Sequence, residues 1–122
     1  MTEQVTITNE WNIELAKSST DDCIEDLQEL LEIWLRQSQI LLKEIRTSLL
    51  NRDSAMLRQA AHTLKGSLQI LCAENAAKVA LGLEYAGRDQ RVDDGAALLV
   101  ELESELDQIR PKIEEFLKKC EL

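Results

Sequence analysis

The sequence predicts an all-α fold: an antiparallel up-down-up-down four-helix bundle with an additional N-terminal helical segment. Three observations predict it. The 122 residues include only four glycines and one proline, which leaves long stretches without a helix breaker. Apolar residues make up 44 % of the chain and recur at the three- and four-residue spacing of amphipathic helices. The connections between these stretches are short, so consecutive helices should lie antiparallel.

We expect one domain with two parts, an N-terminal segment at residues 1–20 and the bundle at residues 21–122. Residues 9–17 are predicted to form a short helix that packs on the bundle, and Ser18, Ser19 and Thr20 end it. Asp21 and Asp22 suit the N-terminus of the first long helix, which should continue to Leu50. The predicted core positions of that helix are Ile24, Leu27, Leu31, Trp34, Leu41, Ile45 and Leu49.

Three more helices follow. Asp53 is the expected N-cap of the first of them, whose apolar face carries Leu57, Ala61, Leu64, Leu68 and Leu71. The next helix, about residues 75–86, should end at Gly87 as its C′ residue, and Gly82 within it is read as a close-packing contact.

The last helix should begin at a cap on Asp93 or Asp94. Its apolar residues keep their register through Pro111, which predicts a kinked but continuous helix although an interior proline costs about 3 kcal/mol. That register is carried by Leu99, Leu102, Leu106, Ile109, Ile113 and Phe116.

Charge and composition exclude several classes of function. The formal net charge of −9 makes nucleic acid and anionic membranes poor partners. No apolar run is long enough to span a bilayer, and the polar residues 1–10 do not resemble a signal peptide. The three cysteines are odd in number and widely spaced, so neither a metal site nor a disulfide framework is expected. A cytoplasmic location is the simplest reading.

His62 is the only histidine, and on a helical wheel it lies about 140° from the centre of the apolar stripe. Its imidazole is therefore expected to face solvent. A neutral imidazole is a good nucleophile towards an activated phosphoryl group, and its unperturbed pKa is about 6.5. Lys65, one turn later, offers a cation that can offset phosphoryl charge. Gly66 costs about 1 kcal/mol in a helix relative to alanine, and the missing side chain permits close approach of another protein.

These features also have a plainer interpretation, because a lone surface histidine is usually just solvated and a helix glycine often serves packing. The stretch Ala61-His62-Thr63-Leu64-Lys65-Gly66-Ser67, however, resembles the signature of the histidine-containing phosphotransfer (HPt) family. Further matches extend the resemblance over roughly residues 22–117. They are Asn51-Arg52-Asp53 with Leu57, Ala60 and Ala61, the pair Leu83-Glu84, then Gly87-Arg88, and Trp34 where the family commonly has phenylalanine.

The resemblance implies a phosphorelay protein in which His62 accepts a phosphoryl group from a receiver-domain phospho-aspartate and passes it to another receiver. Lys65 and Gly66 would assist. Arg58, Gln59 and Gln69 are expected to contact the docked partner. The implied partners are response-regulator receiver domains and a hybrid sensor histidine kinase, and a monomer is expected. The chain would be a carrier and not an enzyme, with no nucleotide or metal site of its own, because the receiver supplies Mg²⁺.

Two positions depart from the family pattern. Cys72 occupies a position often held by glycine, so the corner between the helices is expected to differ. Ala76 stands where leucine is common, so packing there should be looser or completed by another side chain.

What covers the rest of the first long helix stays open at this level. A second apolar stripe on the first long helix contains Leu30, Ile33 and Ile40, of which Ile33 and Ile40 lie farthest from the core stripe. We expect the N-terminal segment to cover it with Trp11, Ile13 or Leu15; the alternative is an exposed docking patch for a receiver or a second copy.

Three rivals to the phosphotransfer interpretation remain: a structural adaptor bundle, a segment of a larger hybrid kinase, and an enzyme with its own active site. Met1 and the lack of a linker-like tail favour a free-standing protein over the kinase segment. No constellation of acid, base and nucleophile favours the enzyme.

Overall fold

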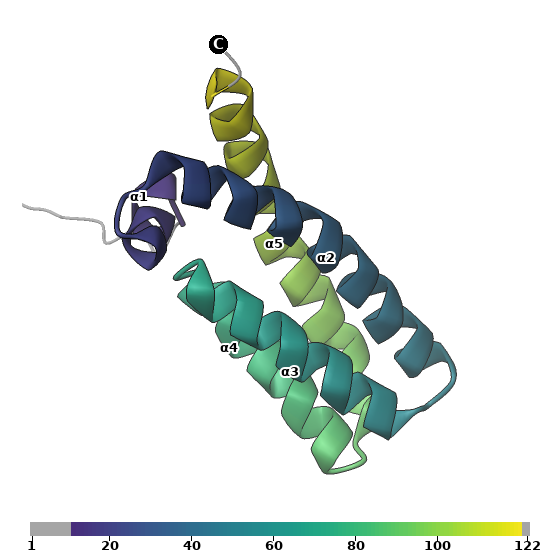
Figure 1. Cartoon of the computed structure of the whole chain (residues 1–122). Helices are drawn as coiled ribbons and strands as arrows, with labels where there is room; N and C mark the ends of the chain where they lie inside the picture. The colour runs from purple at the N-terminus through teal and green to yellow at the C-terminus, as the bar shows by residue number, and fades with distance from the viewer. Residues whose placement is uncertain (1–10, 121–122) are drawn as a thin grey trace, which may run out of the picture.

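A computed structural model describes residues 11–120, and within that range the chain forms helices and no strand. The elements are α1 (Ile13–Lys17), the 3-10 turn η1 (Ser18–Thr20), α2 (Ile24–Leu50), α3 (Ser54–Ile70), α4 (Glu74–Arg88), the 3-10 turn η2 (Val92–Asp94) and α5 (Gly95–Cys120). Four long helices make the bundle, and α1 lies at the end where α2 begins (Figure 1). The predicted all-α bundle with an N-terminal helical segment is confirmed.

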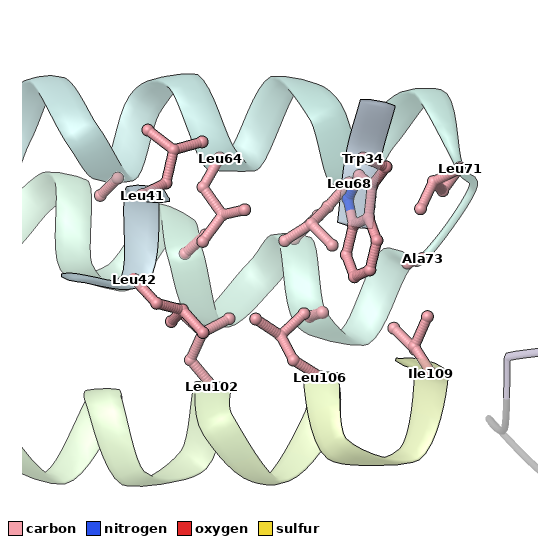
Figure 2. Close-up of a cluster of buried hydrophobic side chains, with 14 of the residues drawn as sticks. Trp34, Leu41, Leu42, Leu64, Leu68, Leu71, Ala73, Leu102, Leu106 and Ile109 are labelled. Carbon is pink, nitrogen blue, oxygen red and sulfur yellow. The ribbon is translucent and has the colours of Figure 1, made fainter. Parts of the chain in front are cut away.

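The core is built from leucine, isoleucine and alanine contributed by all four long helices. Figure 2 shows α2, α3 and α5 contributing Trp34, Leu64 and Leu106 to one cluster. The predicted apolar face of α3 is confirmed, since each of its five residues is fully buried. On α2, Ile24 is exposed instead, because it opens the helix at the end of the bundle.

Two serines in the core of α2 were not anticipated. Ser38 and Ser48 are buried, and each hydroxyl donates to a carbonyl of its own helix, of Leu35 at 3.3 Å and of Ile45 at 2.7 Å. A serine that is satisfied in this way is small enough to sit in the core without an unpaired polar group.

Helix α2 begins later than predicted. Asp21 and Asp22 have φ of 51° and 62°, which is left-handed backbone that cannot start a right-handed helix. The acidic residues of the first turn are instead Glu25 and Asp26. Helix α1 begins at Ile13, capped by the Asn12 side chain; the predicted start at Asn9 lies outside the described residues.

The later helix boundaries are partly as predicted. Asp53 is the N-cap of α3, where its side chain accepts from Met56 N at 3.0 Å. Gly87 does not end α4, which continues through it to Arg88 without a positive φ. Asp93 and Asp94 lie in η2, directly before α5. Helix α5 continues through Pro111, which confirms the prediction from its register.

Trp11 packs at the corner between α3 and α4 and not over the second stripe of α2. Its side chain is 6 % exposed, and its indole N–H donates to Leu71 O at 2.8 Å. Trp11 and Ala76 line the same pocket, so space remains beside the small residue, as the looser packing expected there implies.

The expected cover over the second stripe of α2 is wrong for the part of the N-terminal segment that the structure describes. Ile33 and Ile40 remain 37 % and 58 % exposed, because Trp11 packs at the α3–α4 corner and Leu15 is itself 41 % exposed.

None of the described helices combines the length and the apolar character needed to cross a membrane.

Candidate functional site

The outward face of α3 carries the predicted histidine. His62 follows the fully buried Ala61 and precedes the fully buried Leu64 by two residues, so it lies off the buried face. Its side chain is 64 % exposed. A partner can therefore reach the imidazole directly, without any rearrangement of the bundle.

A carboxylate from the neighbouring helix holds the imidazole in place. Glu84 of α4 lies with Oε2 3.0 Å from His62 Nδ1. An ionised carboxylate can only accept a hydrogen bond, so Nδ1 carries the proton in the neutral ring. The lone pair is then on Nε2, the nitrogen that Glu84 does not contact. An imidazole in this tautomer can act as a nucleophile through Nε2.

The same carboxylate also binds the lysine of the motif. Lys65 Nζ lies 2.9 Å from the second oxygen of Glu84, and the two side chains are only 18 % and 15 % exposed. The cation that the sequence places one turn from His62 is therefore held in an ion pair with Glu84. Glu84 joins His62 and Lys65 into one polar cluster, with the positive charge held beside the imidazole.

The pKa of Glu84 is lowered by this cluster. Burial is the largest single influence and raises the pKa, but the hydrogen bonds and charges of Lys65 and then His62 together outweigh it. Glu84 is therefore ionised at neutral pH, which is the state in which it accepts from the Nδ1–H group.

Gly66 leaves open space one turn beyond His62. A Cβ atom added there would have no other atom within 4 Å, apart from its own helix and its chain neighbours. Internal packing therefore does not require glycine at this position. This supports the interpretation that the missing side chain serves the approach of something outside the molecule.

The three residues expected to contact a partner are all exposed. Arg58 and Gln59 line an open pocket together with His62 and Glu84. Gln69 lines a second open pocket that contains Lys65 and Leu81. The first pocket contains the histidine itself, and both pockets are lined by residues of α3 and α4.

The charge on this helix differs from that of the chain as a whole. Helix α3 contains Arg58 and Lys65 and no acidic residue, whereas the whole chain carries a formal charge of −9. The histidine therefore lies on a positively charged helix of an acidic protein.

Glu84 was the residue that sequence reasoning left without a role, although the pair Leu83-Glu84 had been noted as part of the family resemblance. It lies 22 residues from His62, so no helical spacing connects the two. Its only local signal is its position: Glu84 directly follows the buried Leu83 on α4, next to the core face of its helix. Within residues 11–120, no group of three or more His, Cys, Asp or Glu side chains is placed to hold a metal ion.

Comparisons with known proteins give the family and the fold of this chain. The family model of the Hpt domain matches residues 29–112, more than half of the chain. The chain is also similar to the crystal structure of histidine-containing phosphotransfer protein B (HptB) from Pseudomonas aeruginosa PAO1. The TM-score is 0.83 at 21 % sequence identity, over 90 % of this chain and 96 % of that chain. No curated protein matches the sequence.

Proposed function

This chain belongs to the Hpt domain family, and on that premise we propose that His62 is the phosphorylated residue and that Nε2 is the atom that bonds to phosphorus. Members of the family are phosphocarrier proteins of phosphorelays and not classical enzymes. The observation that carries the assignment is the Nδ1–Glu84 contact at 3.0 Å on an imidazole that is 64 % exposed.

The proposed acceptance step needs only groups that the two proteins supply. Nε2 of His62 attacks the phosphorus of a receiver's aspartyl phosphate. The N–P bond forms, the O–P bond breaks, and the aspartate leaves as a carboxylate. Because the ring proton is already on Nδ1, no proton has to leave Nε2. The ring becomes positively charged, and Glu84 stabilises that charge through the hydrogen bond that it already accepts.

Donation to a second receiver is the reverse of this step. Lys65 contributes positive charge near the phosphoryl oxygens and also keeps Glu84 ionised. Phosphoryl transfer depends mostly on positioning and electrostatics, so an exposed, oriented imidazole suffices on this side of the complex. We propose that the receiver supplies Mg²⁺ as well as the aspartate, and that the chain acts as a monomer with receiver domains and a hybrid sensor kinase as partners.

The test is transfer from a panel of receiver domains that have been charged with a radiolabelled small-molecule phosphodonor. The protein should take up label that is acid-labile and fairly stable in base, as a phosphoramidate is. His62→Gln should abolish labelling without loss of helicity, because the side chain is exposed and contributes little packing. Label that survives in His62→Gln, or label that hydroxylamine removes, would contradict the assignment. A bundle that takes label from no receiver in the panel would favour an adaptor.

A further inference from the structure

Helices α3 and α4 approach each other closely at a glycine one turn from Glu84. Gly87 of α4 is buried, and a Cβ atom added there would lie 2.6 Å from the backbone nitrogen of Arg58 and 2.7 Å from the backbone oxygen of Ser54. Real Cβ atoms essentially never approach other atoms so closely. Both atoms belong to the backbone of α3, so a rotamer change cannot relieve the contact.

Backbone conformation does not explain this glycine. Within the described residues no glycine has a positive φ, and α4 continues through Gly87 to Arg88. Alanine would also favour the helix by about 1 kcal/mol. The close distance between the two helices therefore explains the glycine, because only a residue without a side chain allows it at this point.

The same helix pair carries the site one turn further along. Glu84 precedes Gly87 by three residues, and His62 follows Arg58 by four, so each pair shares a helix face. Because the helices are antiparallel, the Gly87–Arg58 contact and the Glu84–His62 hydrogen bond are neighbours along the groove. The approach at Gly87 therefore determines whether the carboxylate can reach the imidazole.

The geometry points to Gly87 as a positioning residue for His62: it sets the spacing of α3 and α4 that lets Glu84 fix the proton on Nδ1. A methyl group at Gly87 would need the facing backbone about 0.8 Å further away to reach 3.4 Å, where ordinary contact begins. The same shift would stretch the 3.0 Å contact beyond hydrogen-bonding distance. The positioning of the imidazole does not depend on the proposed function. Only the expected effect on phosphoryl transfer rests on it.

Gly82 offers a matched control on the same helix. A Cβ atom there would meet only the side chain of Leu98, at 3.4 Å, which is ordinary van der Waals contact with flexible atoms. Gly82→Ala and Gly87→Ala make the same chemical change and gain the same helix propensity. They differ in what the methyl group meets.

The experiment is ¹⁵N NMR of the imidazole in the full chain, whose single histidine gives unambiguous signals. Wild type and Gly82→Ala should show the Nδ1–H form. Gly87→Ala should show a mixture of both tautomers and should accept phosphoryl groups about two- to fivefold more slowly, in proportion to the lost population with an Nε2 lone pair. Glu84→Asp, which withdraws the carboxylate without touching Gly87, should give the same mixture.

The outcomes are distinct. A folded Gly87→Ala with a wild-type tautomer would overturn the inference. If the variant loses helicity, the spectra are repeated in trimethylamine N-oxide, which favours the folded state. A variant that stays unfolded there would assign Gly87 to folding and overturn its positioning role. If wild type accepts no phosphoryl group but Gly87→Ala still changes the tautomer, the proposed function fails and the positioning role stands.

Discussion

Glu84 contacts both His62 and Lys65, and its ionisation depends on both. Because its folded-state pKa is lowered, the ionised carboxylate contributes stability at neutral pH. That contribution is lost as the pH falls through the folded-state pKa, below the ordinary value of 4.5. The interactions of the site should therefore weaken in acid.

Lys65→Met should raise the pKa of Glu84. Burial, which raises that pKa, would then be opposed by His62 alone. The loss of stability should begin at a higher pH than in the wild type. Urea unfolding at a series of pH values between about 3 and 7 measures it. Lys78→Met removes the same charge from an exposed position of α4 and should leave the profile unchanged.

Gly66→Gln should impair phosphoryl transfer while leaving the bundle as stable or more so. A better helix former gains on the order of 0.5–1 kcal/mol, and nothing in the described residues obstructs the new side chain near its Cβ. A long side chain one turn from His62 would hold the partner away, and a misplacement of about 1 Å can cost roughly 100-fold in rate. Gly66→Ala is the smaller matched change. Thermal melts and transfer rates decide; a lower melting temperature with normal transfer would mean that the glycine serves packing.

At this scale the sequence predicts what lies on a single helix. The helical wheel places His62 outward and leaves Gly66 beside it, and the structure agrees. The partnership of both His62 and Lys65 with Glu84 depends on how α4 lies against α3, and no periodicity within one helix contains that information.

Among the elements, the corners between helices share one backbone conformation. Arg52, Cys72 and Gln90 each adopt a left-handed φ of 50–60° where one helix ends and the next begins. In this conformation the backbone N–H groups at the α3–α4 corner reach back to α3, as with Ala73 N to Leu68 O at 2.9 Å. Cys72 adopts a left-handed, glycine-like φ of 59° at the position where the family often has glycine.

Cys72→Gly should stabilise the protein by up to about 1 kcal/mol, because a left-handed residue with a Cβ costs about 1–2 kcal/mol and the gain is partly offset by the greater freedom of glycine in the unfolded chain. Cys23→Gly is the control: with φ of −78° it has no strain to relieve, so it should be neutral or destabilising. Chemical denaturation of both variants under reducing conditions provides the comparison. A Cys72→Gly variant that unfolds earlier would mean that packing of the thiol outweighs the backbone strain.

Helix positions follow from apolar periodicity, but helix ends are less predictable. Asp21 and Asp22 have the composition of a helix start and instead form a left-handed turn. Gly87 has the composition of a helix end and instead marks a close contact with another helix. Both predictions were wrong for the same reason. The residue types are compatible with a helix end and also with the structure observed, and tertiary contacts decide between the two.

For the molecule as a whole, charge separates the reactive helix from its surroundings. The chain is strongly acidic, while α3 carries two basic residues and no acidic one. An anionic phosphoaspartate site should therefore meet less repulsion at α3 than at the acidic first turn of α2, although Glu84 offsets part of the charge of Lys65. The N-terminal segment illustrates the limit of prediction here: Trp11 packs at the α3–α4 corner, which local sequence does not identify.

Transfer should slow as salt is raised from about 0.05 to 0.5 M, because screening weakens the attraction between the basic residues of α3 and the anionic site. Arg58→Gln should lower the rate at low salt and flatten the salt dependence. Lys118→Gln, in the last turn of α5, removes the same charge away from α3 and should change neither. Stopped-flow transfer kinetics at several salt concentrations give both quantities. An equal effect of the two substitutions would show that only net charge matters.

Helix α3 divides its work between two faces: Leu57, Ala61 and Leu64 are fully buried, while Arg58, Gln59 and His62 are exposed. Mutations on the outer face are therefore free to accumulate without eroding the fold. After gene duplication, two descendants of this chain can come to recognise different partners while they keep the same interior and the same reactive nitrogen. A few surface side chains would then be enough to keep the partners of the two descendants separate.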